Sequence, residues 1–561
     1  MRPLGYVLLV VVSFRRRAGL AAVAGAVTTC MFAPVGLVLA GPLALLGLTL
    51  ALRGVRLPAA AALGVVFGGV FSFSLLWWMR AVGTDAWIAL SLIETAYFLL
   101  LGPVVALVQR LPGWPVWVAA AWVSYEELRA GWPFGGFPWG RLAFGVMDTG
   151  FAPLLPYVGT AGVGFVVALL GTLTAWVVVR VAELRRTGRT AALRDRRVVG
   201  GLVAPYLAVG AVVLLAAVRP YEVPQDGEVV EVAAVQGDVP GAGDDVVPVH
   251  REVTQNHVDT TIELGAAVDA GEEPEPRFVV WPENSTAVDP FLDGRTRTEI
   301  DAAVSAVGVP VVVGGMVDAV DDEQVLNQGI VWDPTTGPGD RYAKRHPVPF
   351  GEYIPFRNAW FTSVVEDFDL IPRDMLSGQR TTPLDVAGVE VGNAICFDVA
   401  YDDGFRAQVG AGAEMLIVQT SNAMFIRTHQ VDQQFEMTRM RALESGKYLV
   451  VAAINGVSGI IRPDGSVAGT IDRRTQGVVA GEVVLNDAVT PAMRYGAGIA
   501  LVLGATTVLA ALGGLLRGRI RRRSMTPSGG QDPAGEAPDE RADAHDAAGA
   551  GPATTTRERV G

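Results

Sequence analysis

Three reactive side chains, Glu283, Lys344 and Cys396, follow apolar, β-rich runs in the second half of the chain. Together they could carry out nucleophilic chemistry on a carbonyl group. The carboxylate can take the proton of the thiol, and the ammonium group can stabilise both the thiolate and the later oxyanion. Such chemistry needs a fold that brings the three side chains together, because their spacing in the sequence does not show that they meet.

Cys396 is the strongest of these signals, because it has no evident disulfide partner. The chain contains 2 cysteines, and the other, Cys30, lies in an apolar segment typical of a membrane span. An unpaired cysteine is either a buried packing residue or a reactive thiol. The glutamate and lysine motifs that precede Cys396 in the chain favour the reactive thiol.

The charged residues also have simpler interpretations. Glu283 could cap the turn after its strand, and Lys344 could be a solvated surface charge. Glu352 could support the site, or it could pair with an arginine such as Arg357. The unusual Trp-Pro-Glu sequence that ends at Glu283 favours a catalytic role for this carboxylate.

The composition indicates a membrane protein. Of the 561 residues, 50% are hydrophobic, and the mean hydropathy is +0.36. A membrane span needs about 20 mostly apolar residues, and runs of this kind cluster in the N-terminal part of the chain and return near its end. We expect about eight spans, at Ala18–Pro34, Val35–Leu52, Ala59–Trp78, Ala86–Val108, Trp114–Tyr125, Tyr157–Val179, Val198–Val218 and Ala497–Leu516.

The arginines predict how these spans are oriented. Arginines at 15–17, 53, 56 and 110, and those within 180–197 and 517–523, fall on one face if the spans number eight. Positively charged residues concentrate on the cytoplasmic side of a membrane. Both termini of this multi-pass plasma-membrane protein would then be cytoplasmic, and the long segment between the last two spans would be extracytoplasmic. The assignment depends on an even number of spans.

The extracytoplasmic segment alternates β-rich runs, such as Val389–Ile395, with helical patterns, such as the one over 296–307. This alternation predicts an α/β layered domain with helices covering the sheet. The C-terminal tail is rich in small and charged residues and lacks large apolar ones, which is typical of disorder. The expected organisation is a cytoplasmic N-terminal segment (1–17), a seven-span region (18–218), a catalytic domain (219–495), a last transmembrane helix (496–516) and a disordered cytoplasmic tail (517–561).

The ordered Glu, Lys and Cys motifs resemble those of the nitrilase superfamily, whose members carry a Glu-Lys-Cys triad on an αββα sandwich. This resemblance covers residues 229–484. Three further sequence motifs make the resemblance more specific. They are Val348-Pro-Phe-Gly-Glu-Tyr353, Gln434-Phe-Glu-Met-Thr-Arg-Met-Arg-Ala442 and the loop Gly136-Phe-Pro-Trp-Gly140. With the catalytic domain inserted between two spans, the chain resembles the apolipoprotein N-acyltransferase family, and its composition is similar to that of actinobacterial members.

The resemblance implies a role for each matching residue. The family pattern has Tyr-Glu after the cysteine, whereas this chain has Phe-Asp, so the contacts that support the triad are expected to differ. The implied roles are Glu283 as proton acceptor, Lys344 as oxyanion stabiliser, Cys396 as nucleophile, and Glu352, Phe397 and Asp398 as supporting residues.

The activity implied by the resemblance is acyl transfer through a cysteine thioester, in the last step of lipoprotein maturation. The donor would be a membrane phospholipid, and the acceptor would be the N-terminal amine of a diacylglyceryl-cysteine apolipoprotein. We expect no cofactor and no metal, since the histidines lack metal-ligand spacing. The alternatives are a membrane-tethered amidase that acts on a small amide, and a non-enzymatic scaffold or transporter, against which the intact triad argues.

Further features bear on lipids and partners. The apolar loop with Trp360 and Phe361 could be a lid that contacts lipid or a local core lobe. Glu94, in the fourth expected span, is either functional or paired with a neighbouring helix. The net charge of −12 argues against nucleic-acid binding. The resemblance to actinobacterial members suggests a polyprenol-phosphate mannose synthase as a partner on the cytoplasmic face.

Overall fold

The computed structural model describes residues 14–286, 288–320, 323–357 and 371–523. Residues 1–517 form one compact unit, which holds the apolar helices and the α/β domain described below, and residues 518–561 are assigned to a second unit. The predicted lid residues Trp360 and Phe361 lie outside the described residues.

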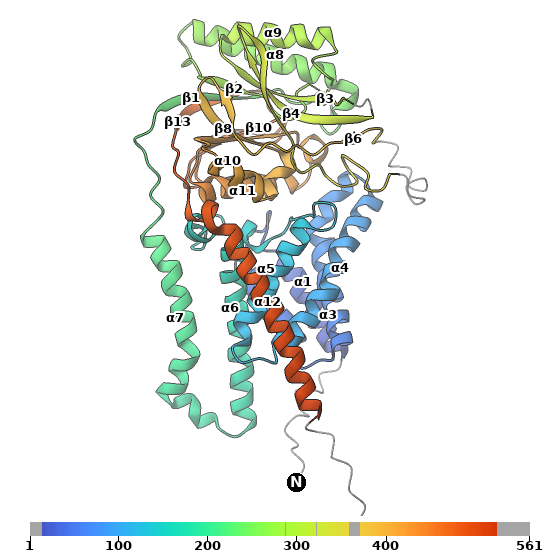
Figure 1. Ribbon diagram of the computed structural model, residues 1–561, viewed down its shortest axis with the longest axis vertical. Coiled ribbons are helices and arrows are strands. Elements are labelled where there is room, and N and C mark those ends of the chain that lie inside the picture. Colours follow the sequence, from blue (N-terminus) through green and yellow to red (C-terminus); the bar gives the residue numbers. More distant parts are fainter. Residues whose placement is uncertain (1–13, 287, 321–322, 358–370, 524–561) are drawn as a thin grey trace, which may run out of the picture. The chain divides into compact units, whose positions relative to one another are not determined.

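Apolar helices flank the α/β domain in the sequence, as Figure 1 shows. Among the described residues, the segments 57–81, 84–108, 152–186, 196–218 and 491–520 are long and apolar enough to cross a membrane, and one further apolar helix is shorter. The structure therefore supports a membrane region of several helices, while the number of spans stays a prediction. The helices are α1 (Phe14–Thr29), α2 (Ala40–Ala51), α3 (Leu57–Leu75), α4 (Thr84–Val108), α5 (Trp114–Gly131), α6 (Leu155–Arg186), α7 (Arg196–Val218) and α12 (Pro491–Arg523).

Small residues let α3 and α4 pack closely. A Cβ atom on Gly64 would lie 2.3 Å from the carbonyl oxygen of Phe98, and one on Gly102 would lie 2.2 Å from that of Ala60. Close approach of this kind is typical of helix pairs in membranes, where van der Waals packing replaces the hydrophobic effect as the driving force. Any larger side chain at Gly64 or Gly102 would push the two helices apart.

The α/β domain contains two sheets. The first has the strand order β13-β1-β2-β3-β4-β5, with β6 paired to β4, and the second has the order β12-β11-β10-β9-β8-β7. Strands of the first sheet are β1 (Val229–Gln236), β2 (Phe278–Val280), β3 (Val311–Asp318), β4 (Gln324–Asp333), β5 (Gly337–Ala343), β6 (Asp374–Met375) and β13 (Gly477–Val484). Strands of the second are β7 (Leu384–Val386), β8 (Val389–Ile395), β9 (Met415–Thr420), β10 (Leu449–Ala453), β11 (Ser458–Ile461) and β12 (Val467–Ile471).

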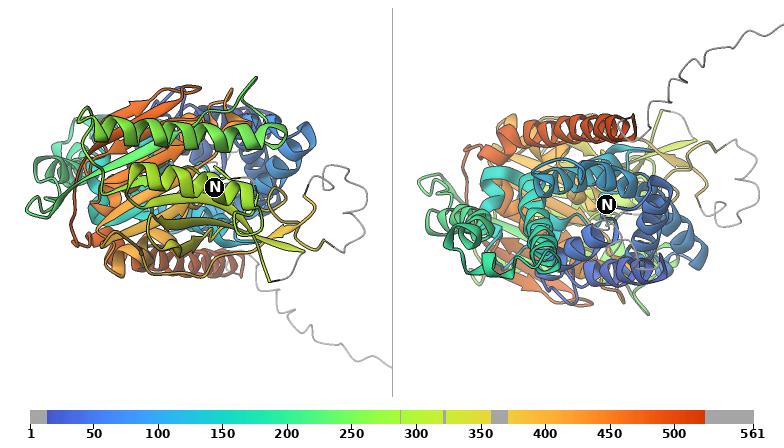
Figure 2. Two further views of the ribbon diagram at one scale, coloured as in Figure 1. Left: turned by 90° about the horizontal axis from the view of Figure 1, so that it is seen from above. Right: turned by 90° about the horizontal axis from the view of Figure 1, so that it is seen from below.

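Helices connect the parallel strands and cover both outer faces. Parallel neighbours need a crossover, usually a helix, and here α8 (His250–Asp269) and α9 (Gly294–Val307) link β1, β2 and β3, while α10 (Asp403–Gly410) and α11 (Gln430–Ser445) link β8, β9 and β10. Figures 1 and 2 show α8 and α9 beyond the first sheet, and Figure 1 shows α10 and α11 between the second sheet and the apolar helices. The predicted αββα sandwich is therefore confirmed.

The two sheets share one apolar core. Val280 and Val312 of the first sheet and Ile417 and Val450 of the second belong to the same buried cluster. Three short connections leave the ends of core strands: Glu283 follows β2, Lys344 follows β5, and Cys396 follows β8. Reactive groups commonly gather where the strands of α/β sheets end, and the core fixes these ends relative to one another.

Candidate active site

The structure brings Glu283 and Lys344 into contact. Lys344 Nζ lies 3.1 Å from Glu283 Oε1 and 2.6 Å from Glu352 Oε1. Lys344 is 0% exposed and Glu283 is 3% exposed. Glu352 therefore contacts the lysine of the predicted site, while Arg357 pairs with Asp374.

The Glu283 carboxylate is held from both sides. Asn327 Nδ2 donates to Oε1 at 2.8 Å, and the backbone N–H of Ser421 donates to Oε2 at 2.9 Å. Buried polar groups of this kind are costly unless they are hydrogen-bonded. Sequence reasoning missed both donors, although the adjacent polar residues Asn327 and Gln328, set among apolar residues of β4, are a signal that could have identified Asn327.

Lys344 remains an ammonium group despite its burial. Burial alone would lower its pKa, but Glu283 and then Glu352 hold the pKa well above its usual value. For Glu352 the effect of burial is the larger one: burial raises the pKa of this carboxyl group more strongly than the Lys344 charge lowers it. The site thus places the Lys344 ammonium group beside Glu352, a carboxyl group that burial makes a weaker acid.

Cys396 occupies a strained position beside these charges. Its φ of 49° lies in the left-handed region, which costs a residue other than glycine about 1–3 kcal/mol and is common at functional sites. Burial, followed by Glu283, raises the pKa of the Cys396 thiol to about 12, while Lys344 lowers it. The resting sulfur is therefore a protonated thiol at neutral pH, and it needs a base during the reaction.

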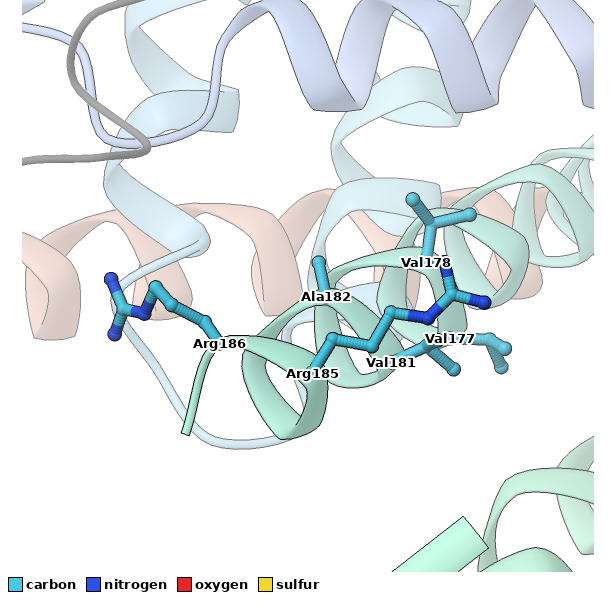
Figure 3. A pocket seen from close by; sticks show the side chains of 6 residues that line it. All are labelled: Val177, Val178, Val181, Ala182, Arg185 and Arg186. Atoms are coloured by element: carbon cyan, nitrogen blue, oxygen red, sulfur yellow. The ribbon is translucent and has the colours of Figure 1, made fainter. Parts of the chain in front are cut away.

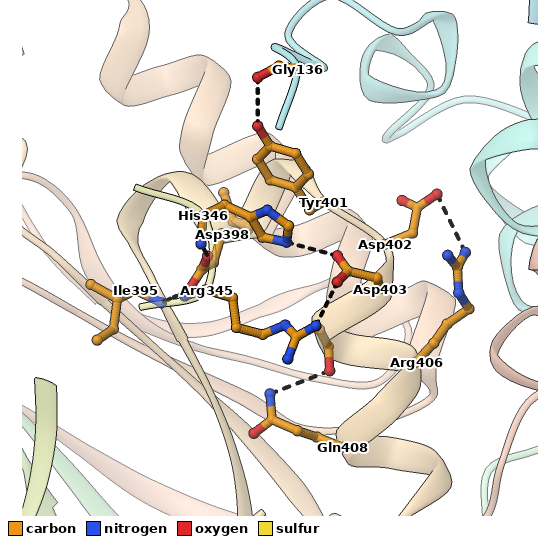
Figure 4. A network of polar contacts seen from close by, with 12 residues as sticks. Gly136, Arg345, His346, Ile395, Asp398, Tyr401, Asp402, Asp403, Arg406 and Gln408 are labelled. Atoms are coloured by element: carbon orange, nitrogen blue, oxygen red, sulfur yellow. Dashed lines mark hydrogen bonds and ion pairs between the residues drawn. The ribbon is translucent and has the colours of Figure 1, made fainter. Parts of the chain in front are cut away.

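Asp398 ties the nucleophile segment to the lysine segment. Its carboxylate accepts the backbone N–H of Ile395 at 3.1 Å and that of His346 at 2.8 Å, and the hydroxyl of Tyr342 donates to it at 3.0 Å. Figure 4 shows the first two of these contacts. Asp398, which stands where the family pattern has a glutamate, thus bridges the segment that carries Cys396 and the segment that carries Lys344.

Phe397 faces the loop that joins α5 to the following helices. Its ring centroid lies 5.2 Å from that of Phe137 and 6.4 Å from that of Trp139. The hydroxyl of Tyr401 donates to the carbonyl of Gly136 at 2.8 Å, as seen in Figure 4. The segment after Cys396 therefore packs directly on the aromatic loop Gly136-Phe-Pro-Trp-Gly140, a contact that the sequence did not indicate.

His346 joins the same network. Its ring stacks on Tyr401 at 3.7 Å between centroids, and its Nε2 lies 2.8 Å from Asp403 Oδ1. Arg345 Nη2 donates to the other oxygen of Asp403 at 2.9 Å. These contacts hold the loop that carries Lys344 against the segment that follows Cys396.

Asp402 forms an ionic junction that the sequence did not indicate. Its carboxylate accepts Arg141 Nη1 and Thr160 Oγ1, both at 2.9 Å, and pairs with Arg441 Nη2 at 2.8 Å. Although burial opposes it, the arginines hold the pKa of Asp402 far below its usual value. Arg141 and Thr160 come from the helical region, so this carboxylate fastens the catalytic domain to it.

Glu94 is paired inside the helical region. Arg129 Nη1 of α5 donates to Glu94 Oε2 of α4 at 2.8 Å and to the carbonyl of Phe137 at 3.2 Å. Both side chains are buried. Of the two alternatives for Glu94, the contacts favour pairing with a neighbouring helix, which also anchors the aromatic loop.

A large open groove lies away from these residues. It runs along the last turns of α6, at the end of the bundle far from the sheets, and has a volume of about 710 Å³. Figure 3 shows its lining: Val177, Val178, Val181, Ala182, Arg185 and Arg186. The groove contains none of the predicted catalytic residues.

A buried glutamate and lysine beside a partly buried cysteine, on an αββα sandwich, are typical of the carbon-nitrogen hydrolase class. The family model for carbon-nitrogen hydrolase matches residues 231–490, and the model for the apolipoprotein N-acyltransferase N-terminal domain matches residues 24–173. The chain is 34% identical to an apolipoprotein N-acyltransferase of Mycolicibacterium smegmatis, over 86% of this chain and 83% of the relative. The chain belongs to the apolipoprotein N-acyltransferase family.

A second relative agrees with this assignment. An apolipoprotein N-acyltransferase of Methylococcus capsulatus is 30% identical over 80% of this chain and 86% of the relative. Among solved structures, a carbon-nitrogen hydrolase from Helicobacter pylori is 15% identical, covers 49% of this chain and 93% of its own, and has a TM-score of 0.34. An amidase from Nesterenkonia sp. is 16% identical over 47% of this chain and 93% of its own, with a TM-score of 0.32.

Proposed function

We propose that this protein transfers an acyl chain from a membrane phospholipid to the N-terminal amine of a diacylglyceryl-cysteine apolipoprotein. The observation that carries the proposal is the buried Glu283–Lys344 pair beside Cys396, in a chain that also holds several helices apolar enough to cross a membrane. Relatives named apolipoprotein N-acyltransferase support it over the amidase alternative. A small soluble amide would need no membrane region.

The first half-reaction forms an acyl-enzyme. Glu283 takes the proton of Cys396 as Sγ attacks the ester carbonyl carbon of the phospholipid. The carbonyl electron pair moves to oxygen, where the Lys344 ammonium stabilises it. When this intermediate collapses, the ester C–O bond breaks, the lysophospholipid leaves with the proton that Glu283 held, and a thioester remains.

The second half-reaction consumes the thioester. The α-amine of the apolipoprotein attacks the thioester carbonyl, and Glu283 takes up the amine proton. The C–S bond then breaks, its electron pair returns to Cys396, and the proton on Glu283 restores the thiol. The product is an amide that carries the third acyl chain, and Lys344 again stabilises the oxyanion.

Topology and organisation remain parts of the proposal. We infer an extracytoplasmic catalytic domain over 219–495 between transmembrane regions at 18–218 and 496–516, with a cytoplasmic segment at 1–17 and a cytoplasmic tail at 517–561. The arginine clusters at the helix ends support this orientation. A polyprenol-phosphate mannose synthase partner stays a prediction.

The test of the proposed function uses the purified chain in phospholipid vesicles with a synthetic diacylglyceryl-cysteine peptide. We expect mass spectrometry to show a peptide heavier by one acyl chain at its amine, together with an equal amount of lysophospholipid. A matched peptide with an acetylated N-terminus should gain nothing, because it lacks a nucleophilic amine. Hydrolysis of small amides without any acylated peptide would instead support the amidase.

A further inference from the structure

A glutamine on α11 reaches the sulfur of the proposed nucleophile. Gln434 Nε2 lies 3.8 Å from Cys396 Sγ and 3.0 Å from Thr420 Oγ1. The side chain is 3% exposed, so water does not compete strongly for its amide. Gln434 lies in the phrase that marked the family resemblance, but neither the sequence nor the proposed mechanism gives it a function.

Two neighbouring amides fix which end of Gln434 faces the sulfur. Asn422 Nδ2 donates to Gln434 Oε1 at 2.7 Å, and Gln430 Nε2 donates to the same oxygen at 2.9 Å. An amide oxygen has two lone pairs, so these donors satisfy it fully. A flipped amide would point its NH2 group at both donors and lose both bonds, so the network assigns the N–H end to the sulfur.

Thr420 adds a second neutral donor at the same place. Its Oγ1 accepts an N–H from Gln434, which leaves its own proton free to point elsewhere. A hydrogen bond from Thr420 lowers the pKa of Cys396, against the larger effect of burial. The sulfur is therefore approached by two polar groups from β9 and α11, on a different part of the fold from Lys344.

We propose that Gln434 is a catalytic residue that donates its N–H to Cys396 Sγ whenever the sulfur carries negative charge. The charge develops as the thiol loses its proton to Glu283, and again when the C–S bond of the thioester intermediate breaks and its electron pair returns to sulfur. In a buried site such a bond is stronger than in water. This assignment rests on the proposed function, because it presumes that Cys396 is the nucleophile.

The experiment measures how fast iodoacetamide alkylates Cys396 as a function of pH, in a Cys30→Ser background that leaves one thiol in the chain. Gln434→Met removes the donor and keeps a side chain of similar length. We expect its alkylation profile to move to higher pH, with the rate at pH 8 about tenfold lower, as for the loss of one hydrogen bond to a charged group. The kcat of acyl transfer should fall by a similar factor while KM stays the same.

Gln433→Met is the matched control. Gln433 is the preceding residue of the same helix and is also buried, but its amide faces the helical region, where it contacts Trp139 at 2.7 Å and the carbonyl of Ala33 at 2.8 Å. Its variant should leave the alkylation profile of Cys396 unchanged. The same shift in both variants would show a general loss of packing and would overturn the assignment.

Gln434→Glu covers the case in which the methionine variant does not fold. A carboxylate keeps the acceptor that Asn422 and Gln430 require, but it presents an oxygen to the sulfur in place of an N–H. We expect an even larger shift to high pH. A normal profile in either folded Gln434 variant, with Cys396→Ala inactive, refutes only the role of Gln434, whereas transfer by Cys396→Ala refutes the proposed function itself.

Discussion

Replacing Lys344 with methionine is expected to lower the rate of acyl transfer by about 10²–10³-fold, the usual cost of removing one oxyanion stabiliser. Its ammonium group is buried between Glu283 and Glu352, and these carboxylates keep its pKa well above the usual value. Because Lys344 also lowers the pKa of Cys396, the variant should need a higher pH for alkylation of its thiol. Turnover in vesicles and iodoacetamide labelling measure the two effects.

Lys447→Met is the control for the loss of a buried lysine. Lys447 is 0% exposed, and its Nζ lies 3.1 Å from Asn486 Oδ1, away from the predicted site. Both variants remove a buried amine and should lower thermal stability. Lys344→Met leaves the Glu283 and Glu352 carboxylates without their cation, which costs about 3–5 kcal/mol, and Lys447→Met leaves Asn486 without a donor, which costs about 1–3 kcal/mol. Only Lys344→Met should lose turnover in protein that is still folded. Equal losses of turnover in the two variants would mean that lower stability, and not the missing Lys344 charge, explains the slower acyl transfer.

Replacing Glu283 with glutamine is expected to lower acyl transfer by about 10²–10⁴-fold, the range for loss of a general base. The amide is similar in shape but cannot accept a proton from Cys396. It also removes a negative charge that raises the pKa of the thiol, so alkylation of Cys396 should move to lower pH. Glu283→Gln and Lys344→Met would thus both lose acyl transfer, but they would shift the pH needed for alkylation of the Cys396 thiol in opposite directions.

Asp340→Asn tests whether this pattern is specific to Glu283. Asp340 is a carboxylate in the middle of β5, the strand that leads to Lys344, but it pairs with Arg380 at the partly exposed edge. Neutralising it should change neither turnover nor the alkylation profile of Cys396. If Glu283→Gln raised the pH needed for alkylation, or if it kept most of the activity, Glu283 would not be the base.

Much of the catalytic domain could be predicted from the sequence, because its parallel strands are continuous apolar runs. The predicted run Val389–Ile395 has the same bounds as β8, and the predicted helix over 296–307 lies within α9. The strand β12 was not predicted, since most of its residues are partly exposed and only Ile471 is buried. Local patterns thus identify the long, continuously apolar strands, and they miss the short buried strand β11 as well as the partly exposed edge strand β12.

The contacts between distant segments could not be predicted in the same way. The fifth predicted span ended at Tyr125, where charges begin, but α5 continues to Gly131. Its charges are paired in three dimensions, as Arg129 pairs with Glu94 of α4 and Glu127 pairs with Arg141. No sequence pattern reveals such partners, and the same is true of the Asp402 junction.

The central claim is that Cys396 carries the acyl chain between two lipids. The most direct test is mass spectrometry of the Cys30→Ser protein after incubation with phospholipid alone, without an acceptor. We expect one acyl group on the peptide that contains Cys396. Hydroxylamine should remove this group, and the Cys396→Ala protein should not carry it. An adduct elsewhere, or acylation of the acceptor by protein that never carries an acyl group on Cys396, would contradict it.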